Sequence, residues 1–256
     1  MKSSYSKAII SNNFVEVIQQ AYSPNIKRTS LGGRKPTSKQ SMENFEANIK
    51  VSINRARKRI RRLLECNFTE QYAFITLTFK PTNEFDLTDI NTCNKLFRVF
   101  KKRLTYYLKK NRHSKFTYLG VTEFHNEQGN IHYHLVCNLI EISTKTLENI
   151  WSYGFVSKMV SDSRPTDNEK IASYLNKGIA DKRLNGHDRY LKSHKLKQPD
   201  IYELENIADF YAHLDKCIPS FKHGDTYYSP YTGETKYEQY YLENAKELID
   251  YVQDAG

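Results

Sequence analysis

The sequence predicts an α+β protein built around one open antiparallel sheet. Three observations support this. The β-branched and aromatic run Phe74-Ile75-Thr76-Leu77-Thr78-Phe79 is typical of a strand that is at least half-buried. Two further strand-like runs, 116–124 and 131–139, flank a polar segment that contains a glycine, as expected of a hairpin. Helical apolar spacing then occurs near 89–110 and 144–152.

In chain order, the elements of this core are a strand, a helix, two strands, a helix and a last strand near 154–160. The succession β-α-β-β-α-β is the ferredoxin-like, or RRM-like, arrangement, an antiparallel sheet with helices on one face. The opposite face of the sheet is then free for a ligand. We assign this core domain to residues 71–199.

The N-terminal part of the chain precedes this core. Residues 1–40 are expected to form an arm and linker, with a short strand or helical turn at 14–21. The stretch 23–40 is rich in Pro, Gly, Ser and basic residues. Residues 41–70 are assigned to one basic amphipathic helix, because apolar residues keep helical spacing from 41 to 64.

Residues 200–256 are expected to form a C-terminal extension. A helix is predicted near 200–215, a tyrosine-rich hairpin around 229–233 and a final helix near 242–253. The tyrosines of the hairpin could stack on single-stranded bases, although aromatic residues in paired strands more often serve packing.

The charge of the chain indicates a polyanionic partner. Its formal net charge is +10, and two stretches, 47–64 and 90–122, contain basic but no acidic residues. A solvated face is the common role of such charges, but two separate blocks favour DNA contact. The candidate DNA-binding residues are Arg55, Arg57, Lys58, Arg59, Arg61 and Arg62 in the first block, and Lys101, Lys102 and Arg103 in the second.

Several classes of protein are disfavoured. The four cysteines are widely spaced without a CxxC pair, so we expect reduced thiols in a cytoplasmic protein and no zinc site. No apolar run is long enough to cross a bilayer, and the N-terminus lacks the apolar segment of a signal peptide, so no membrane partner is expected. The chain has no GxxxxGK[ST] motif and hence no fused P-loop helicase.

The most informative stretch is Gly129-Asn130-Ile131-His132-Tyr133-His134-Leu135-Val136. Side chains alternate between the two faces of a strand, so His132 and His134 share one face. Two imidazoles are then within reach of one divalent ion. An isolated pair of this kind is more often structural than metal-binding, and the residues around it decide between the two.

Glu123, near the end of the preceding strand, is the candidate third ligand. An even turn centred on Gln128-Gly129 would place Glu123 opposite His134 and His125 opposite His132, all on one face. Two imidazoles and a carboxylate would then form a three-ligand site with open positions. An odd loop would send Glu123 to the other face, and the sequence leaves both possibilities open.

The third motif, Tyr174-Leu175-Asn176-Lys177, lies on a predicted helix. A capping box at 166–169 and helical spacing of Ile171, Leu175 and Ile179 indicate that helix. Tyr174 and Lys177 are three residues apart and therefore neighbours on one helix face. The chain has 19 tyrosines, so the motif gains weight only from following the two histidines.

Taken in order, FITLTF, a Glu before GNIHYHLV, and YLNK resemble the motifs of the HUH-superfamily rolling-circle replication initiators of plasmids and phages. The resemblance covers Tyr72 to Pro199. It implies the HUH endonuclease fold, with metal binding by Glu123, His132 and His134. It also implies a metal-dependent DNA endonuclease that nicks and rejoins strands by attack of Tyr174, assisted by Lys177, with a 5′-phosphotyrosine intermediate and a free 3′-hydroxyl.

The resemblance further implies the partners and the cofactor. The substrate would be single-stranded or hairpin origin DNA, and a host helicase is a possible partner. Two imidazoles and one carboxylate suit Mn²⁺, with Mg²⁺ also usable. Some family members carry two tyrosines one turn apart, but position 178 here is Gly, which indicates a single catalytic tyrosine.

A single tyrosine requires a second nucleophile to end a replication round. The candidates are the Tyr174 of a second protomer and a water activated by Asp181, seven residues along, although a solvated helix charge is the more common role for such a residue.

Two alternative functions stay open. A single-tyrosine transposase or a relaxase would share the site, although relaxases usually place their tyrosine before the histidines. A non-catalytic RRM-like nucleic-acid-binding protein would explain the basic blocks, but it needs no Glu and two His on one face.

Overall fold

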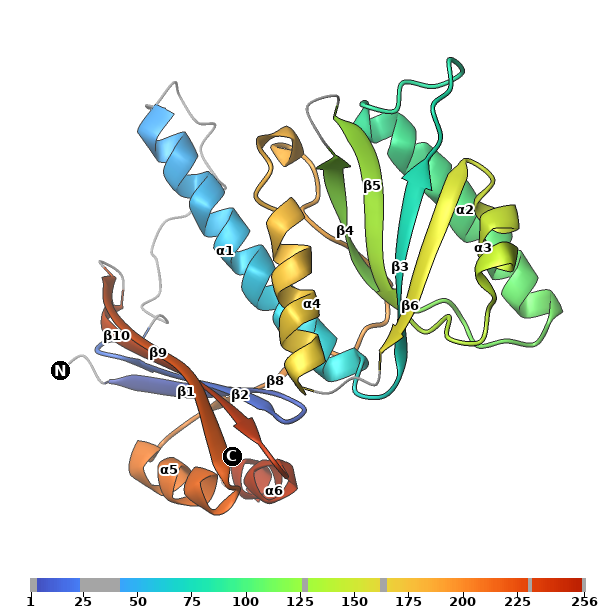
Figure 1. The fold of residues 1–256 in the computed structure, drawn as a ribbon. Helices are drawn as coiled ribbons and strands as arrows, with labels where there is room; N and C mark the ends of the chain where they lie inside the picture. Colours follow the sequence, from blue (N-terminus) through green and yellow to red (C-terminus); the bar gives the residue numbers. More distant parts are fainter. Residues whose placement is uncertain (1–3, 24–41, 126–128, 162–164, 230–231, 255–256) are drawn as a thin grey trace, which may run out of the picture. The chain divides into compact units, whose positions relative to one another are not determined.

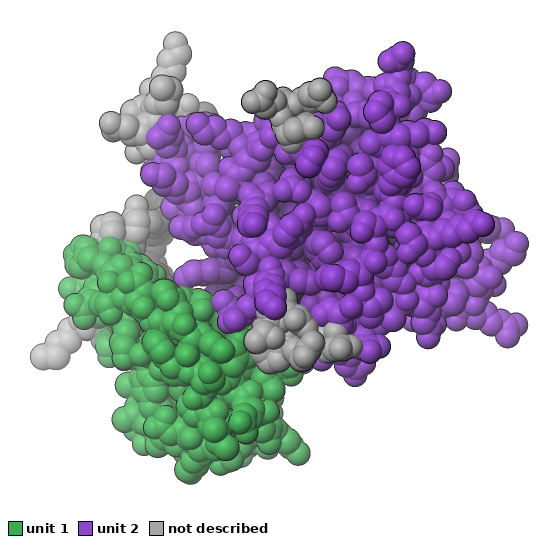
Figure 2. All heavy atoms as spheres, viewed as in Figure 1, with its two compact units in different colours: residues 1–40, 198–256 green, residues 41–197 purple. Residues whose placement is uncertain are grey.

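The computed structural model of the chain describes residues 4–23, 42–125, 129–161, 165–229 and 232–254. The chain divides into two compact units, which Figure 2 shows in different colours. One unit comprises residues 41–197. The other combines the two ends of the chain, residues 1–40 and 198–256.

The unit 41–197 contains the predicted core. Its strands are β3 (Tyr72–Phe79), β4 (Tyr118–His125), β5 (Asn130–Cys137), β6 (Gly154–Ser161) and the short β7 (Leu191–Lys192). They pair antiparallel in the order β6-β3-β5-β4-β7. Without β7, this is the strand order of a ferredoxin-like sheet. The predicted fold class is therefore confirmed, and the structure shows an α+β protein with open sheets.

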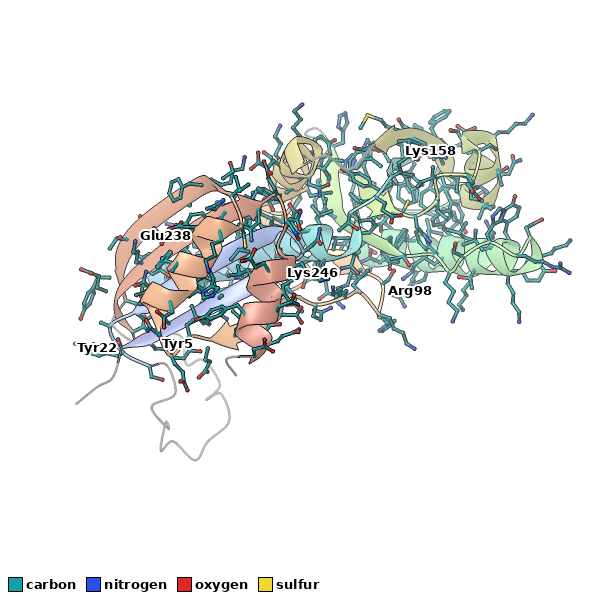
Figure 3. All side chains as sticks on the ribbon, turned by 90° about the horizontal axis from the view of Figure 1, so that it is seen from below. Tyr5, Tyr22, Arg98, Lys158, Glu238 and Lys246 are labelled. Atoms are coloured by element: carbon teal, nitrogen blue, oxygen red, sulfur yellow. The ribbon has the colours of Figure 1, made fainter. Side chains whose placement is uncertain are left out.

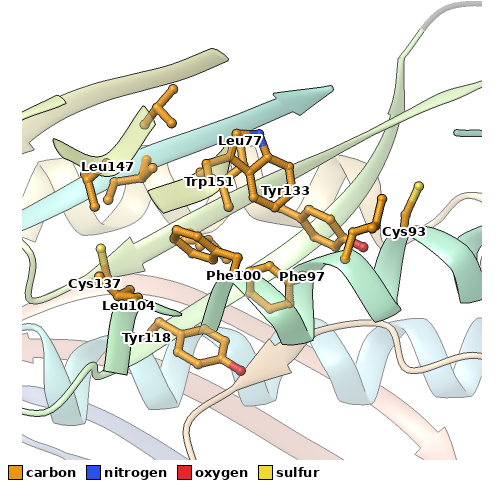
Figure 4. Close-up of a cluster of buried hydrophobic side chains, with 14 of the residues drawn as sticks. Leu77, Cys93, Phe97, Phe100, Leu104, Tyr118, Tyr133, Cys137, Leu147 and Trp151 are labelled. Carbon is orange, nitrogen blue, oxygen red and sulfur yellow. The ribbon is translucent and has the colours of Figure 1, made fainter. Parts of the chain in front are cut away.

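Helices α2 (Ile90–Lys110) and α3 (Thr144–Trp151) cover one face of this sheet (Figure 1). They bury the alternate residues of β3 and β5 that point to this face, among them Leu77 and Tyr133. The rings of Phe97 and Tyr133 stack with centroids 4.6 Å apart, and Trp151 lies beside Phe100 (Figure 4). The period of two along the strands thus fixes which face carries the apolar core.

The opposite face is only partly covered. Helices α1 (Met42–Asn67) and α4 (Pro165–Gly178) lie over β4 and β5, where apolar side chains of both helices bury Leu119, Val121 and Val136 (Figure 1). On β6, by contrast, Phe155 and Met159 are 65% and 56% exposed. The sheet face predicted to be free is therefore open along β3 and β6 and closed along β4.

The second unit contains a second antiparallel sheet. Its order is β8 (Asp200–Glu203), β1 (Tyr5–Ser11), β2 (Phe14–Gln20), β10 (Gly233–Leu242) and β9 (Pro219–Ser229). Helices α5 (Ile207–Lys216) and α6 (Lys246–Asp254) pack against one face through an apolar cluster. The Tyr5 hydroxyl donates a hydrogen bond to Glu203 at 2.9 Å, which ties β8 to β1 (Figure 3).

This second sheet corrects the sequence analysis. The expected N-terminal arm and C-terminal extension are not separate appendages, because both contribute strands to one sheet. Residues 200–203 form a strand where a helix is predicted, because their pairing partner, β1, lies at the other end of the chain. The final helix begins at Lys246 because β10 continues to Leu242. The predicted linker lies, beyond residue 23, outside the described residues.

The tyrosine-rich hairpin exists as β9 and β10. Its tyrosines have two different environments: Tyr237 and Tyr241 are buried, whereas Tyr227 and Tyr228 are exposed. All four cysteines are unpaired. Within the described part of the chain, no helix has the length and apolar character needed to cross a membrane.

Candidate functional site

The hairpin of β4 and β5 places the candidate ligands on one face of the sheet. Glu123 pairs with His132, and the last pair is His125 with Asn130. The predicted pairing of Glu123 with His134 is therefore wrong, because the connection is longer than a two-residue turn. The shift is an even number of residues, so the face of each side chain is unchanged. Glu123, His132 and His134 share the partly open face.

Two of these side chains are in direct contact. The Nε2 atom of His134 lies 2.5 Å from Oε2 of Glu123, and its Nδ1 atom lies 3.0 Å from the Thr76 hydroxyl on β3. The His134 side chain is only 4% exposed, and that of Glu123 is 32% exposed. Both ring nitrogens of His134 thus have polar partners, which fixes the orientation of the ring.

The protonation of His134 follows from its burial. Desolvation lowers the pKa of His134, and the opposing effect of the Glu123 charge is smaller. A neutral imidazole beside an ionised carboxylate donates Nε2–H to Glu123 and accepts a hydrogen bond from the Thr76 hydroxyl at Nδ1. A threonine hydroxyl can also accept, so the same ring could reverse its tautomer and leave Nε2 free as a ligand.

His132 lies further from this pair. Its ring stacks on His125 with centroids 4.8 Å apart and is 6.4 Å from the ring of His134. Burial, and then the neighbouring histidines, lower the pKa of His132. Its neutral form is the one that can donate a lone pair to a metal ion.

We compared this arrangement with the requirements of a metal site. The donor types and their shared face fit a divalent ion, and His134 and Glu123 already converge. Within the described residues, however, no group of three or more His, Cys, Asp or Glu side chains is arranged to hold a metal ion. Glu123 and His134 instead bind one another, so a shared ion would have to replace their hydrogen bond.

Helix α4 brings Tyr174 to the same place. Its ring lies 5.0 Å from the ring of His134 and 5.5 Å from that of Phe74, nearly perpendicular to both. Leu175 and Ile171 are buried and anchor the helix, whereas Tyr174 is 39% exposed. The helix begins at Pro165, earlier than the predicted capping box at 166–169.

Gly178 explains how closely α4 can approach the sheet. A Cβ atom at this position would lie 3.1 Å from the backbone oxygen of Thr122 on β4. A larger side chain would therefore press against the strand, next to Glu123. The glycine that indicates a single tyrosine is thus also a packing requirement.

The site does not activate Tyr174 in this state. Burial and then the charge of Glu123 raise the pKa of Tyr174. Lys177 is exposed, with its Nζ atom 6.0 Å from the centre of the Tyr174 ring. Additional positive charge would therefore be needed to form a phenolate here.

The two basic blocks lie on opposite sides of the sheet. Helix α1, which carries residues 55–62, packs on the same face as Tyr174, and Arg61 forms an ion pair with Glu169 on α4 at 3.2 Å. Helix α2 packs on the opposite face. There Lys101 donates to the Tyr118 hydroxyl and Arg103 to Ser152. The structure therefore does not bring Lys101, Lys102 and Arg103 to the candidate site.

Asp181 has a different position from the one expected. Helix α4 ends at Gly178, so Asp181 does not continue the helix face of Tyr174. It caps a short 3₁₀ helix (Lys182–Leu184) and forms an ion pair with Arg183 at 2.6 Å. These bonds occupy the carboxylate that was considered for activating water.

The structure adds residues that sequence reasoning missed. Thr76 is assigned only a core role from the sequence, yet it faces His134. Phe155 and Met159 project from β6 on the same sheet face, level with Thr78 and Phe74 in the register. Their position in an alternating strand was the available signal, because the parity that places His132 and His134 on this face also places them there.

The chain was compared with known proteins. Residues 72–182 match the model of the family described as Replication-associated protein ORF2. This segment is similar to replication-associated proteins. It runs from β3 to just beyond α4 and contains Glu123, His132, His134, Tyr174 and Lys177. Comparisons with curated proteins and with solved structures found no match. The family match indicates a replication initiator, and such a protein binds DNA.

Proposed function

We propose that the chain is a rolling-circle replication initiator that nicks single-stranded origin DNA with Tyr174 and later rejoins strands. The observation that carries this proposal is the convergence of Tyr174 with the His134–Glu123 pair on a partly open sheet face. These residues lie within the segment that matches replication-associated proteins.

The proposed reaction is a transesterification at phosphorus. The Tyr174 oxygen attacks the scissile phosphate, and the bond to the 3′ oxygen breaks. The DNA 5′ phosphate remains on the tyrosine, and the phenolic proton is balanced by protonation of the leaving 3′ oxygen. Attack by a 3′-hydroxyl on the phosphotyrosine reverses the step and rejoins the strand. No net change in the number of phosphodiester-type bonds occurs, so no energy source is needed.

Glu123, His134 and His132 are the residues that would hold a divalent cation, Mn²⁺ or Mg²⁺. When bound, such an ion supplies positive charge that polarises a phosphate oxygen. Glu123 would then face a cation, and its tendency to raise the pKa of Tyr174 would be offset. Lys177 would add a further positive charge near the ring.

The open part of the sheet offers a surface for the DNA strand. Phe155 and Met159 are exposed on β6, on the face that carries the candidate site. Exposed aromatic side chains can stack on unpaired bases. The basic helix α1 packs against the same face of the sheet and would contact phosphates.

The experiment uses single-stranded oligonucleotides that tile the replicon encoding the protein, with Mn²⁺ or with EDTA. Each oligonucleotide carries a fluorophore at either its 3′ or its 5′ end. We expect a covalent protein–DNA adduct with the 3′ label only, and a released fragment with the 5′ label. Tyr174→Phe should give neither product. An adduct that retains the 5′ label, or no adduct on any oligonucleotide, would refute the proposal.

A non-catalytic nucleic-acid-binding protein is the second candidate. Two observations favour it: Tyr174 has a raised pKa, and Glu123 and His134 bind one another rather than forming a ready three-ligand group within the described residues. DNA binding with no adduct in the experiment above would support this candidate. A single-tyrosine transposase or relaxase would give the same adduct, and joining of the bound strand to an unrelated target DNA would identify it.

A further inference from the structure

A cavity of about 420 Å³ lies in the unit 41–197, away from the residues proposed for cleavage. Its wall on one side is a stretch of α1, and on the other a segment that follows the 3₁₀ helix after α4. The lining residues are Ser52, Arg55, Ala56 and Arg59 from α1, and His187, Asp188, Arg189 and Tyr190 from the second segment.

The cavity is positively charged. Three arginines line it and Asp188 is the one acidic residue among the lining residues. Arg55 and Arg59 are four residues apart on α1, so they lie on one face of the helix and reach the same cavity. Arginine binds phosphate oxygens through paired N–H groups. The cavity therefore has the chemistry of a phosphate site.

Arg189 has a different role from the other two arginines. It is 9% exposed and donates to the Ile179 carbonyl at 2.6 Å, to Asn185 at 3.0 Å and to Ser52 at 3.3 Å. These bonds hold the second wall against α1 and to the residue just after α4. Arg189 therefore adds charge and fixes the shape of the cavity, and we assign the contact with a ligand to Arg55 and Arg59.

Tyr190 gives the cavity an aromatic surface. It is half-buried and packs against the apolar cluster formed by α1, α4 and the sheet. A fixed aromatic ring beside arginines is the combination that binds a base together with its phosphate. The volume of the cavity is within the range of sites for small organic groups, about 300–1,000 Å³. A single nucleotide fits these dimensions.

We propose that this cavity holds one nucleotide of single-stranded DNA, with its phosphate on Arg55 and Arg59 and its base against Tyr190. The inference rests on the proposed function for the identity of the strand. A DNA strand is favoured over a free nucleotide because exposed Lys50 and Arg57 continue the positive charge along α1 beyond the cavity. Since Arg189 joins this wall to the end of α4, an occupied cavity would position a DNA segment relative to the helix of Tyr174.

The test is a binding measurement with two matched double variants. Arg55→Gln/Arg59→Gln removes the cavity arginines, and Lys50→Gln/Arg57→Gln removes the same charge from the same helix outside the cavity. Fluorescence anisotropy with a labelled oligothymidylate should show a loss of affinity of about tenfold or more for the first variant. The second variant should lose no more than about threefold. Equal losses would overturn the inference, because only general electrostatics would then act.

Tyr190 provides a separate test of base binding. Tyr190→Leu should lower the affinity for oligothymidylate by about fivefold or more, and Tyr190→Phe, which keeps the ring, should bind as the wild type does. Thermal unfolding followed by circular dichroism checks that each variant is folded. Unchanged affinity of a folded Tyr190→Leu variant would overturn the proposed base contact.

Competition distinguishes the source of the phosphate. Thymidine monophosphate and inorganic phosphate should displace the oligonucleotide only weakly, because each offers a single phosphate. Tight binding of thymidine monophosphate that depends on Arg55 and Arg59, with oligothymidylate affinity unaffected by their loss, would overturn the proposed DNA contact.

These measurements are independent of cleavage, since they use the Tyr174→Phe background. If no oligonucleotide forms an adduct with the wild type, yet the cavity variants lose affinity as expected, the proposed function fails and the nucleotide site stands. If adducts form and the cavity variants bind normally, the opposite holds.

Discussion

Replacing Thr76 by valine separates a role in orienting His134 from a role in folding. The Thr76 hydroxyl lies 3.0 Å from Nδ1 of His134, whose side chain is 4% exposed. If His134 binds a metal through Nε2, its Nδ1–H must find an acceptor, and Thr76 provides it. Valine has the same shape but no hydroxyl, so the ring would lose this partner while the strand keeps its packing.

The expected magnitudes differ between stability and metal affinity. An unpaired buried ring nitrogen costs about 1–3 kcal/mol, and the added methyl group recovers up to about 0.8 kcal/mol. The free energy of unfolding should therefore fall by about 1 kcal/mol. Loss of a partner that orients a metal-binding histidine typically lowers metal affinity by about 10- to 100-fold. A loss of about 1 kcal/mol would leave a protein of ordinary stability almost entirely folded, so unfolding would not explain such a change in affinity.

The assay is calorimetric titration with Mn²⁺, together with urea unfolding of the same samples. Thr78→Val is the control, because Thr78 lies two residues along β3 on the same face and pairs with His132 rather than with His134. Its Mn²⁺ affinity should match that of the wild type. Wild-type Mn²⁺ affinity in a destabilised Thr76→Val variant would show that Thr76 acts in folding alone and would refute the reasoning about His134.

Three further predictions concern the tyrosines and the basic helix. Tyr174→Phe keeps the ring contacts, so the free energy of unfolding should change by no more than about 0.5 kcal/mol while the covalent adduct disappears; mass spectrometry that located the DNA on Tyr190 would refute this assignment. Neutralising three of the basic residues at 55–62 should reduce the slope of log K against log[salt] by about 2–3, and an unchanged slope in a salt titration would exclude DNA contact by this face. Burial and the bond to Glu203 raise the pKa of Tyr5 to about 12. Because an unfolded tyrosine titrates near 10, the stability that this bond contributes should be complete below about pH 10 and lost as the pH rises towards 12. Faster amide exchange of β1 at high pH should show this in the wild type but not in Tyr5→Phe.

Position in the chain alone determined much of the candidate site. The alternation of side chains along 72–79 and 130–137 places Thr76, His132 and His134 on one face whatever the exact register. The helical spacing of Ile171 and Leu175 likewise identified the helix that carries Tyr174 and left its ring off the buried face. These are local rules, and the fold class followed from the order in which they appear.

Tertiary structure decided what local rules cannot. The pairing of β1 with β8 joins residues nearly two hundred positions apart, so the strand at 200–203 has no local signature of its partner. The two basic blocks look alike in sequence, but packing places α1 and α2 on opposite faces of the sheet. The contact between Glu123 and His134, and the raised pKa of Tyr174, arise from burial and from charges on neighbouring elements. Burial and electrostatic fields depend on distance in space, and separation along the chain does not determine them.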